Sequence, residues 1–110
     1  MARSDGDIIG FLTLREHFHE AWEVHCIAVR ASDRGRGVGR ALQRYAELWL
    51  SARGARVVQV KTLAASHPSA AYAETRAFYS SVGYVPLGVF PELWSPQLPV
   101  LLLVKVLSAS

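Results

Sequence analysis

The chain has 110 residues, enough for one domain with a modest hydrophobic core, so we predict a single domain over residues 1–110. Hydrophobic residues make up 51% and charged residues 19%, a composition that excludes an intrinsically disordered chain. The formal net charge is +3, and no apolar run approaches the roughly 20 residues of a membrane-spanning helix. A single cysteine excludes an intrachain disulfide, and residues 1–7 lack the apolar core of a signal peptide, so we expect a cytoplasmic protein.

Two strands are predicted before the first helix. Residues 7–15 are mainly apolar and include Gly10, and a glycine inside a strand indicates a bulge or a close backbone approach. After a polar turn at residues 17–20, residues 22–29 alternate as a second strand. The alternation predicts one face made of Glu23, His25, Ile27 and Val29 and another made of Trp22, Val24, Cys26 and Ala28. The cysteine thiol is then expected to be a buried structural group on the face opposite the glutamate.

An amphipathic helix and a third strand follow. Over residues 38–52 the spacing predicts one apolar stripe that consists of Val38, Ala41, Leu42, Tyr45, Leu48, Trp49 and Ala52. Gly54 is placed to end this helix. Residues 56–63 form the strand, and residues 66–69 form a loop with candidate helix caps.

The C-terminal part contains a second helix and two more strands. Residues 70–82 have helical spacing and end at a glycine, and residues 84–90 form a fourth strand. Three prolines interrupt the chain around Leu93 and Trp94, and residues 99–107 form a continuously apolar strand that needs cover on both faces. The order β-β-α-β-α-β-β predicts an α/β (α+β) fold with a mixed sheet and helices packed on it.

The loop between the second strand and the first helix carries the strongest functional signal. Gly35, Gly37 and Gly39 alternate with arginine and valine where the strand passes into the helix. The first N–H groups of a helix lack intrahelical partners and carry the positive end of the macrodipole, so a diphosphate placed there accepts several hydrogen bonds. Glycines allow the backbone to come close, and the neighbouring arginines add charge-assisted contacts.

Four interpretations of this loop are possible. A dinucleotide site requires Gly-x-Gly-x-x-Gly and a tight turn, whereas the spacing here is Gly-x-Gly-x-Gly after a long polar loop. A P-loop requires Gly-Lys-Ser/Thr, which does not follow. A plain structural turn and a coenzyme A site both remain compatible with the loop alone.

The residues around this loop resemble the GNAT superfamily of acyl-CoA-dependent N-acetyltransferases. Its signature, Arg/Gln-x-x-Gly-x-Gly/Ala after a strand ending in Leu-x-Val, matches Arg34-x-x-Gly37-x-Gly39 after residues 27–29. A second family segment, Asn-x-x-Ala-x-x-Phe-Tyr-x-x-x-Gly-Phe, departs at Tyr72 and Thr75. It matches at Phe78, Tyr79, Gly83 and, conservatively, Tyr84. The Tyr72 departure removes the asparagine amide that contacts pantetheine in the family.

The resemblance implies a GNAT-like fold with acetyl-CoA as co-substrate and no metal. Pantetheine is expected between the strands around Val29 and Lys61, with the thioester carbonyl held by a backbone N–H near Val29. The expected cofactor-binding residues are Ile27, Ala28, Val29, Arg34, Gly35, Arg36, Gly37, Val38, Gly39, Arg40, Thr75 and Phe78.

The resemblance also implies catalytic residues. Tyr79 matches the family tyrosine that protonates the departing thiolate. Glu23, at the position of a glutamate base in some members, and His25, with an ordinary pKa of about 6.5, are candidate bases, and water is the third. His17 and His19 do not complete a metal-binding set with His25.

The family usually begins with a strand, two helices and another strand that help to wall the acceptor site, and only residues 1–6 precede the first predicted strand. The chain is then a minimal version, or a partner subunit supplies the wall, and we expect a homodimer in which Leu101, Leu103 and Val106 pack against the partner. The predicted function is acetyl or short acyl transfer to a primary amine, on a small molecule or a protein. The alternative is a non-catalytic module that binds coenzyme A or contacts nucleic acid.

Overall fold

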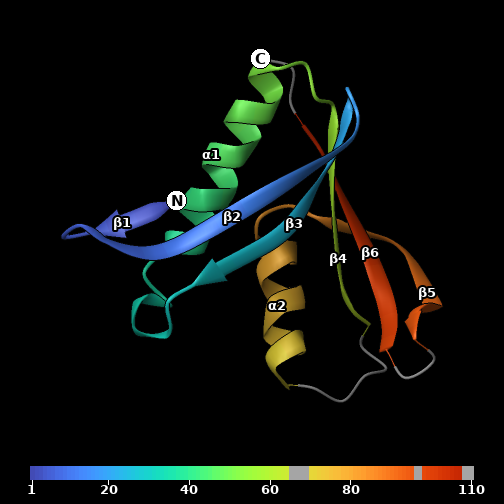
Figure 1. The fold of residues 1–110 in the computed structure, drawn as a ribbon. Helices are drawn as coiled ribbons and strands as arrows, with labels where there is room; N and C mark the ends of the chain where they lie inside the picture. The colour runs from blue at the N-terminus through green and yellow to red at the C-terminus, as the bar shows by residue number, and fades with distance from the viewer. Residues whose placement is uncertain (65–69, 96–97, 108–110) are drawn as a thin grey trace. The chain divides into compact units, whose positions relative to one another are not determined.

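The computed structural model describes residues 1–64, 70–95 and 98–107 (Figure 1). The elements in chain order are β1 (Ala2–Ser4), β2 (Asp7–Phe18), β3 (Ala21–Val29), a 3-10 turn (Ala31–Asp33), α1 (Val38–Ala52), β4 (Val57–Leu63), α2 (Ala70–Ser81), β5 (Val85–Ser95) and β6 (Leu98–Val106). The predicted α/β class, with a mixed sheet and two helices, is confirmed. The short β1 and the 3-10 turn were not predicted.

The chain divides into two compact units. The first comprises Met1–Val58 and the residues from Val106 onward, and the second comprises Gln59–Lys105.

The first unit is an antiparallel sheet with α1 packed on one face. Its strands are adjacent in the order β1-β2-β3, and α1 contacts β2 and β3 (Figure 1). Leu42, Ala46 and Leu50 of α1 are buried, whereas Tyr45 and Leu48 are exposed. Of the apolar stripe predicted from the sequence only Leu42 is buried, so the prediction of which helix face is buried is wrong. Complete burial of a side chain such as Leu50 contributes roughly 1.5–3 kcal/mol to stability, so this helix face is the main source of stability for α1.

Gly10 allows α1 to approach β2 closely. A Cβ atom at this position would lie 3.2 Å from side-chain atoms of both Val38 and Leu42, and 3.0 Å from the Ala28 carbonyl oxygen. The expectation of a close approach at this glycine is therefore confirmed.

A β-bulge at His25 changes the face alternation of β3. Thr13 of β2 pairs with Cys26, whereas the next residue, Leu14, pairs with Val24, so His25 is an extra residue on β3. Residues that pair directly across two strands share a face of the sheet. Side chains on the two sides of the bulge therefore do not follow one uninterrupted period of two.

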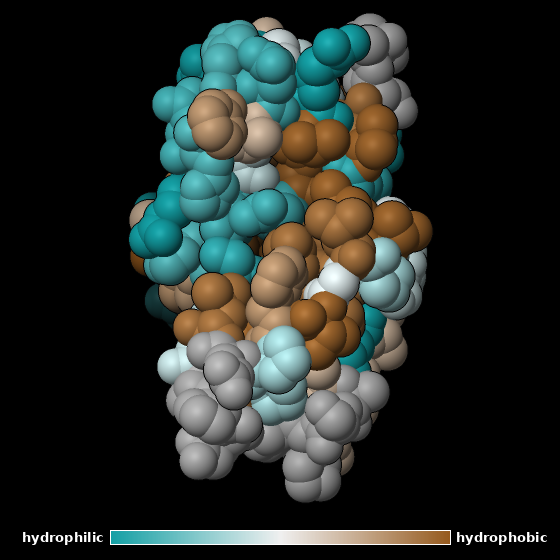
Figure 2. Space-filling model, turned by 90° about the vertical axis from the view of Figure 1, so that its right-hand side faces the viewer, coloured by the Kyte–Doolittle hydropathy of each residue, from teal (hydrophilic) through white to brown (hydrophobic). Residues whose placement is uncertain are grey.

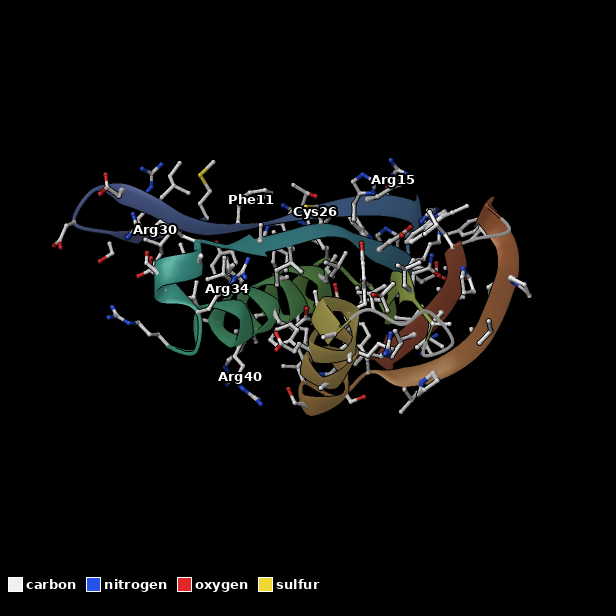
Figure 3. The ribbon with its side chains drawn as sticks, turned by 90° about the horizontal axis from the view of Figure 1, so that it is seen from below. Phe11, Arg15, Cys26, Arg30, Arg34 and Arg40 are labelled. Carbon is white, nitrogen blue, oxygen red and sulfur yellow. The ribbon has the colours of Figure 1, made fainter. Side chains whose placement is uncertain are left out.

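The bulge moves Glu23 to the face opposite the one that Ile27 and Val29 occupy. Glu23 pairs with Arg15, and Figure 3 shows Arg15 and Cys26 pointing away from α1. Ile27 and Val29 pair with residues 12 and 10 of β2, on the face that α1 covers. The expectation that Glu23 shares a face with Ile27 and Val29, opposite the cysteine, is wrong because strict alternation does not include a bulge.

The second unit contains α2 and strands that are adjacent in the order β4-β6-β5. Tyr79 of α2 is buried, and its ring lies 5.5 Å from that of Tyr84, which follows the helix. Lys105 of β6 donates a hydrogen bond to the Val82 carbonyl at the C-terminal end of α2. Gly83, with a φ of 102°, ends this helix as predicted.

The structure corrects the prediction for the C-terminal strands. β5 continues to Ser95, through Leu93 and Trp94, instead of ending at residue 90. A register shift between Phe90 and Ser95 accommodates this irregular part of the strand, where Pro91 lacks a backbone N–H. The predicted loop at residues 66–69 lies outside the described residues. Within the described ranges, no helix is long and apolar enough to cross a membrane.

Candidate active site

The loop between β3 and α1 presents an uncapped helix N-terminus. Gly35 and Gly37 both have a φ of 79°, a left-handed conformation that is strained for residues with a Cβ atom. Gly37 is the N-cap residue of α1, and no side chain caps the helix. The first intrahelical bond there runs from the Ala41 N–H to the Gly37 carbonyl, so the N–H groups of residues 38–40 have no intrahelical partner.

The loop fits a bound diphosphate. A Cβ atom placed on Gly37 would have no heavy atom within 4 Å, so the space beside the helix N-terminus is open. Serine, threonine or aspartate normally supplies an oxygen at an N-cap, and a phosphate oxygen can take the same role here. The exposed backbone of Arg34–Gly37 leaves this N-terminus accessible.

The arginines of the loop are held by an acidic side chain and a carbonyl group. The Arg30 Nε donates to Asp33 at 2.6 Å, and Arg36 lies 3.8 Å from the other Asp33 oxygen. The Arg34 Nε donates to the Val29 carbonyl at 3.3 Å. Figure 3 shows Arg30 and Arg34 beside this loop, and Arg40 on the side of α1 away from β2 and β3.

Asp33 is a further residue of this loop, in contact with two of its arginines and absent from the residues expected from the sequence. Asp33 is only 5% exposed, and its carboxylate also accepts a hydrogen bond from the Ser32 hydroxyl at 3.2 Å. The hydrogen bond from Arg30 lowers the pKa of Asp33, burial opposes that effect, and the charge of Arg30 lowers the pKa further. The spacing Arg-x-x-Asp, three residues apart at the end of a strand, is the sequence signal that indicates this pair.

The expected cofactor-binding residues of the first unit form two segments, 27–29 and 34–40, which are separated by residues 30–33. Their exposure differs along these segments: Ile27, Ala28, Val29, Val38 and Gly39 are half-buried, whereas Arg34, Gly35, Arg36, Gly37 and Arg40 are exposed. The exposed members are those suited to anion contacts, and the half-buried members line the strand and the first turn of the helix.

The candidate bases lie in different surroundings. Glu23 is buried, and its Oε1 lies 2.6 Å from Nε2 of His17 on β2. His25, at the bulge, is exposed, and its ring makes no hydrogen bond within the described part of the chain. In the sequence His17 stands out only as part of an incomplete metal-binding set with His19 and His25. Its position six residues before Glu23, across a hairpin turn, is the signal that relates the two side chains.

Cys26 is exposed, which corrects the expectation of a buried thiol. The reason is that α1 covers only one face of β2 and β3, and the register places the cysteine on the other face. Among the described residues, no cluster of three or more histidine, cysteine, aspartate or glutamate side chains is arranged to hold a metal ion.

The candidate residues of the second unit lie on α2. Tyr79 is buried and also contacts the half-buried Phe78, with ring centroids 5.7 Å apart. The Thr75 hydroxyl donates to the Ala71 carbonyl within the helix at 3.1 Å, which leaves its oxygen available as an acceptor. Tyr72, at the position of the family asparagine, is 40% exposed.

Comparisons with known proteins identify the family. Residues 1–86 match the family model described as "Acetyltransferase (GNAT) domain", and the chain therefore belongs to the GNAT family. A search of curated proteins finds no significant match.

Solved structures share the fold. A protein from Desulfovibrio desulfuricans, assigned to the GNAT family of acetyltransferases, aligns with a TM-score of 0.85 at 20% identity over 96% of this chain and 65% of its own. An aminoglycoside 6'-N-acetyltransferase complexed with coenzyme A aligns with a TM-score of 0.82 at 21% identity over 97% of this chain and 71% of its own. A GNAT family acetyltransferase from Elizabethkingia anophelis with acetyl-CoA bound aligns with a TM-score of 0.79 at 19% identity over 96% of this chain and 72% of its own.

The chain spans about two thirds of the length of these proteins, 65% in the first case. At these identities the structural likeness establishes the fold, and the predicted GNAT-like fold is confirmed.

Proposed function

We propose that this protein is an N-acetyltransferase that transfers an acetyl or short acyl group from coenzyme A to a primary amine by direct attack. The observation that carries the proposal is the uncapped N-terminus of α1, which follows two left-handed glycines and is flanked by exposed arginines. Membership of the GNAT family supports it, as do two structural neighbours that contain coenzyme A or acetyl-CoA.

The loop residues are proposed to bind the pyrophosphate of coenzyme A. The N–H groups of residues 38–40 donate to its oxygens, and Gly37 allows the close approach. Arg36 and Arg40 add charge-assisted contacts, while Arg34 stays anchored to the end of β3. The backbone of residues 27–29 and the Thr75 and Phe78 side chains are proposed to contact the pantetheine arm, as the family resemblance implies.

Direct attack requires a proton acceptor for the ammonium and a proton donor for the thiolate. Tyr79 is the proposed donor, because a phenol is a suitable acid for a thiolate. Tyr79 also matches, in the Phe78-Tyr79 motif, the family tyrosine to which the resemblance assigns this role. Glu23, His25 and water are the candidate acceptors. No metal is required for this chemistry.

An amine panel tests the proposal. Purified protein with acetyl-CoA is incubated with polyamines, aminoglycosides, amino acids and lysine-containing peptides, and released thiol is measured. The assay uses a Cys26→Ser background, because the exposed Cys26 would itself react with a thiol reagent. Amine-dependent thiol release is the expected result. Saturable binding of acetyl-CoA without release for any amine would favour the alternative, a non-catalytic coenzyme A-binding module.

A homodimer is also proposed. Figure 2, which views the side on which β5 lies, shows hydrophobic side chains at the surface. On β5 the exposed apolar residues are Val85, Leu87, Val89, Phe90, Leu93 and Trp94. Exposed apolar surface of this kind favours an interface with a second copy. Leu103, one of the residues first expected at the interface, is buried within the chain and cannot contact a partner. We therefore propose that the exposed side chains of β5 form the interface. A cytoplasmic location and a single-domain organisation remain predictions from the sequence.

A further inference from the structure

His17 and Glu23 form a pair at the hairpin end of β2 and β3. The His17 Nε2 lies 2.6 Å from the Glu23 Oε1, which is within hydrogen-bond distance. The Glu23 side chain is 6% exposed and the His17 side chain is 35% exposed. The carboxylate is therefore shielded from solvent, whereas the imidazole can be reached from it.

We propose that His17 is the proton acceptor of the acyl transfer and that Glu23 is the buried carboxylate that orients it; the proposal rests on the function proposed above. With Glu23 ionised, the His17 Nε2 carries the hydrogen and donates it to Oε1, which leaves the lone pair of Nδ1 free. Within the described ranges this second ring nitrogen makes no hydrogen bond. A buried carboxylate behind an accessible imidazole is the arrangement that fixes a histidine tautomer and stabilises the imidazolium in hydrolytic triads.

The division of roles follows from exposure. A general base must come within hydrogen-bond reach of the proton that it removes. A substrate ammonium approaching from solvent reaches the half-exposed imidazole before the buried carboxylate. Imidazole is also the side chain that most often serves as a general base.

The pair lies at a suitable distance from the loop that is proposed to hold the pyrophosphate. Glu23 precedes Val29 by six residues along β3, which is about 20 Å at the rise of an extended strand. This span is comparable with an extended pantetheine arm, which separates the pyrophosphate of coenzyme A from its sulfur. A pantetheine arm whose pyrophosphate end is held by the loop, and which contacts residues 27–29, therefore extends along β3 toward the end where the pair is located.

Each proton that moves in the proposed acyl transfer has a donor and an acceptor. The N–H bond of the substrate ammonium breaks as the Nδ1–H bond of His17 forms, and the amine lone pair then attacks the thioester carbonyl. The C–S bond breaks, and the thiolate takes a proton from the proposed acid. The attacking nitrogen loses its second proton as the amide forms, and that proton, carried by water, restores the acid. The imidazolium gives its proton to water. Glu23 stays ionised throughout and stabilises the imidazolium.

Replacement of His17 by glutamine tests the base directly. A glutamine amide can still donate to Glu23, so the hairpin contact is retained while the proton acceptor is lost. We expect kcat to fall by about 100-fold or more with an alkylamine from the panel, the usual contribution of a general base, with the KM for acetyl-CoA unchanged. The loss should be much smaller with hydroxylamine, which is already neutral at pH 7. His19→Gln is the matched control, because this exposed histidine in the same hairpin makes no side-chain hydrogen bond among the described residues.

A readout without turnover tests the pair independently. Long-range ¹H–¹⁵N spectra of the folded protein, assigned with the His17→Gln variant, report which ring nitrogen of His17 carries the hydrogen. We expect hydrogen on Nε2 in the wild type and a changed His17 signal in Glu23→Gln. Hydrogen on Nδ1 alone in the wild type would overturn the assignment.

The outcomes separate this proposal from the proposed function. An active wild type whose His17→Gln variant keeps kcat within about threefold, while Glu23→Gln is inactive, assigns the base to Glu23 itself and refutes the role of His17. Binding of acetyl-CoA without thiol release for any amine refutes the acyltransferase function, and the role of His17 with it.

Discussion

Replacement of Gly37 by leucine should abolish the stabilisation of this protein by coenzyme A. The change has two effects that a control can separate. A non-glycine residue in the left-handed conformation costs roughly 1–2 kcal/mol, and Gly37 has a φ of 79°. The new side chain would also occupy the open space beside the N-terminus of α1, where the pyrophosphate is proposed to bind.

Gly6→Leu is the matched control. Gly6 lies in the turn between β1 and β2, has a φ of 84°, and has no heavy atom within 4 Å of a Cβ placed on it, as at Gly37. Both variants should therefore lose a similar amount of stability without ligand. At about 4–8 °C of Tm per kcal/mol for a domain of about this size, that loss is on the order of 5–10 °C.

Thermal unfolding with and without coenzyme A measures the difference. At a free ligand concentration 100 times Kd, binding adds about 2.7 kcal/mol, so the wild type and Gly6→Leu should each gain about 11–22 °C. Gly37→Leu, although equally folded without ligand by circular dichroism, should gain nothing. Equal ligand-induced shifts in the two leucine variants would refute a pyrophosphate site at the N-terminus of α1.

Four further predictions concern other residues. Tyr79→Phe should lower kcat more than the affinity for coenzyme A, because the lost proton matters mainly in the transition state; an unchanged kcat where chemistry is rate-limiting would exclude Tyr79 as the acid. Because Arg30 lowers the pKa of Asp33 in the folded state, this group stabilises the fold above the unfolded pKa of about 3.9, and that contribution is lost as pH falls through the lower folded pKa. The Tm of the wild type should therefore fall more steeply below about pH 4 than that of Asp33→Asn, and parallel curves would contradict the ion pair. Cys26 should react with a thiol reagent in the native protein nearly as fast as in denaturant, and protection would contradict its exposed position. Light scattering at micromolar concentration should give a dimer mass that Leu87→Glu, on β5, lowers to that of a monomer, and a monomeric wild type would refute the dimer.

Local sequence signals were sufficient for the helix and for the loop that precedes it. Residues 38–52 form a helix as predicted, because an apolar stripe with a period of 3.6 residues can be buried only by a helix. The left-handed Gly37 follows from the alternating glycines at a strand–helix junction, and Gly54 and Gly83 end helices as expected. These features depend on contacts between residues close in sequence, so the chain specifies them without knowledge of its partners in space.

The positions of Glu23, Cys26 and His17 were decided only by tertiary structure. A β-bulge has no reliable local signal, because it depends on which residue of the neighbouring strand each residue pairs with. One extra residue, His25, was enough to move Glu23 to the opposite face of the sheet, which is the face that Cys26 also occupies. His17 lies at a second register shift, between Glu16 and Phe18, and its contact with Glu23 depends on how the hairpin brings together two side chains that periodicity along either strand does not relate. The sequence by itself therefore determined the fold class and the glycine-rich loop that is proposed to bind an anion, whereas strand pairing determined that His17 and Glu23 are in contact.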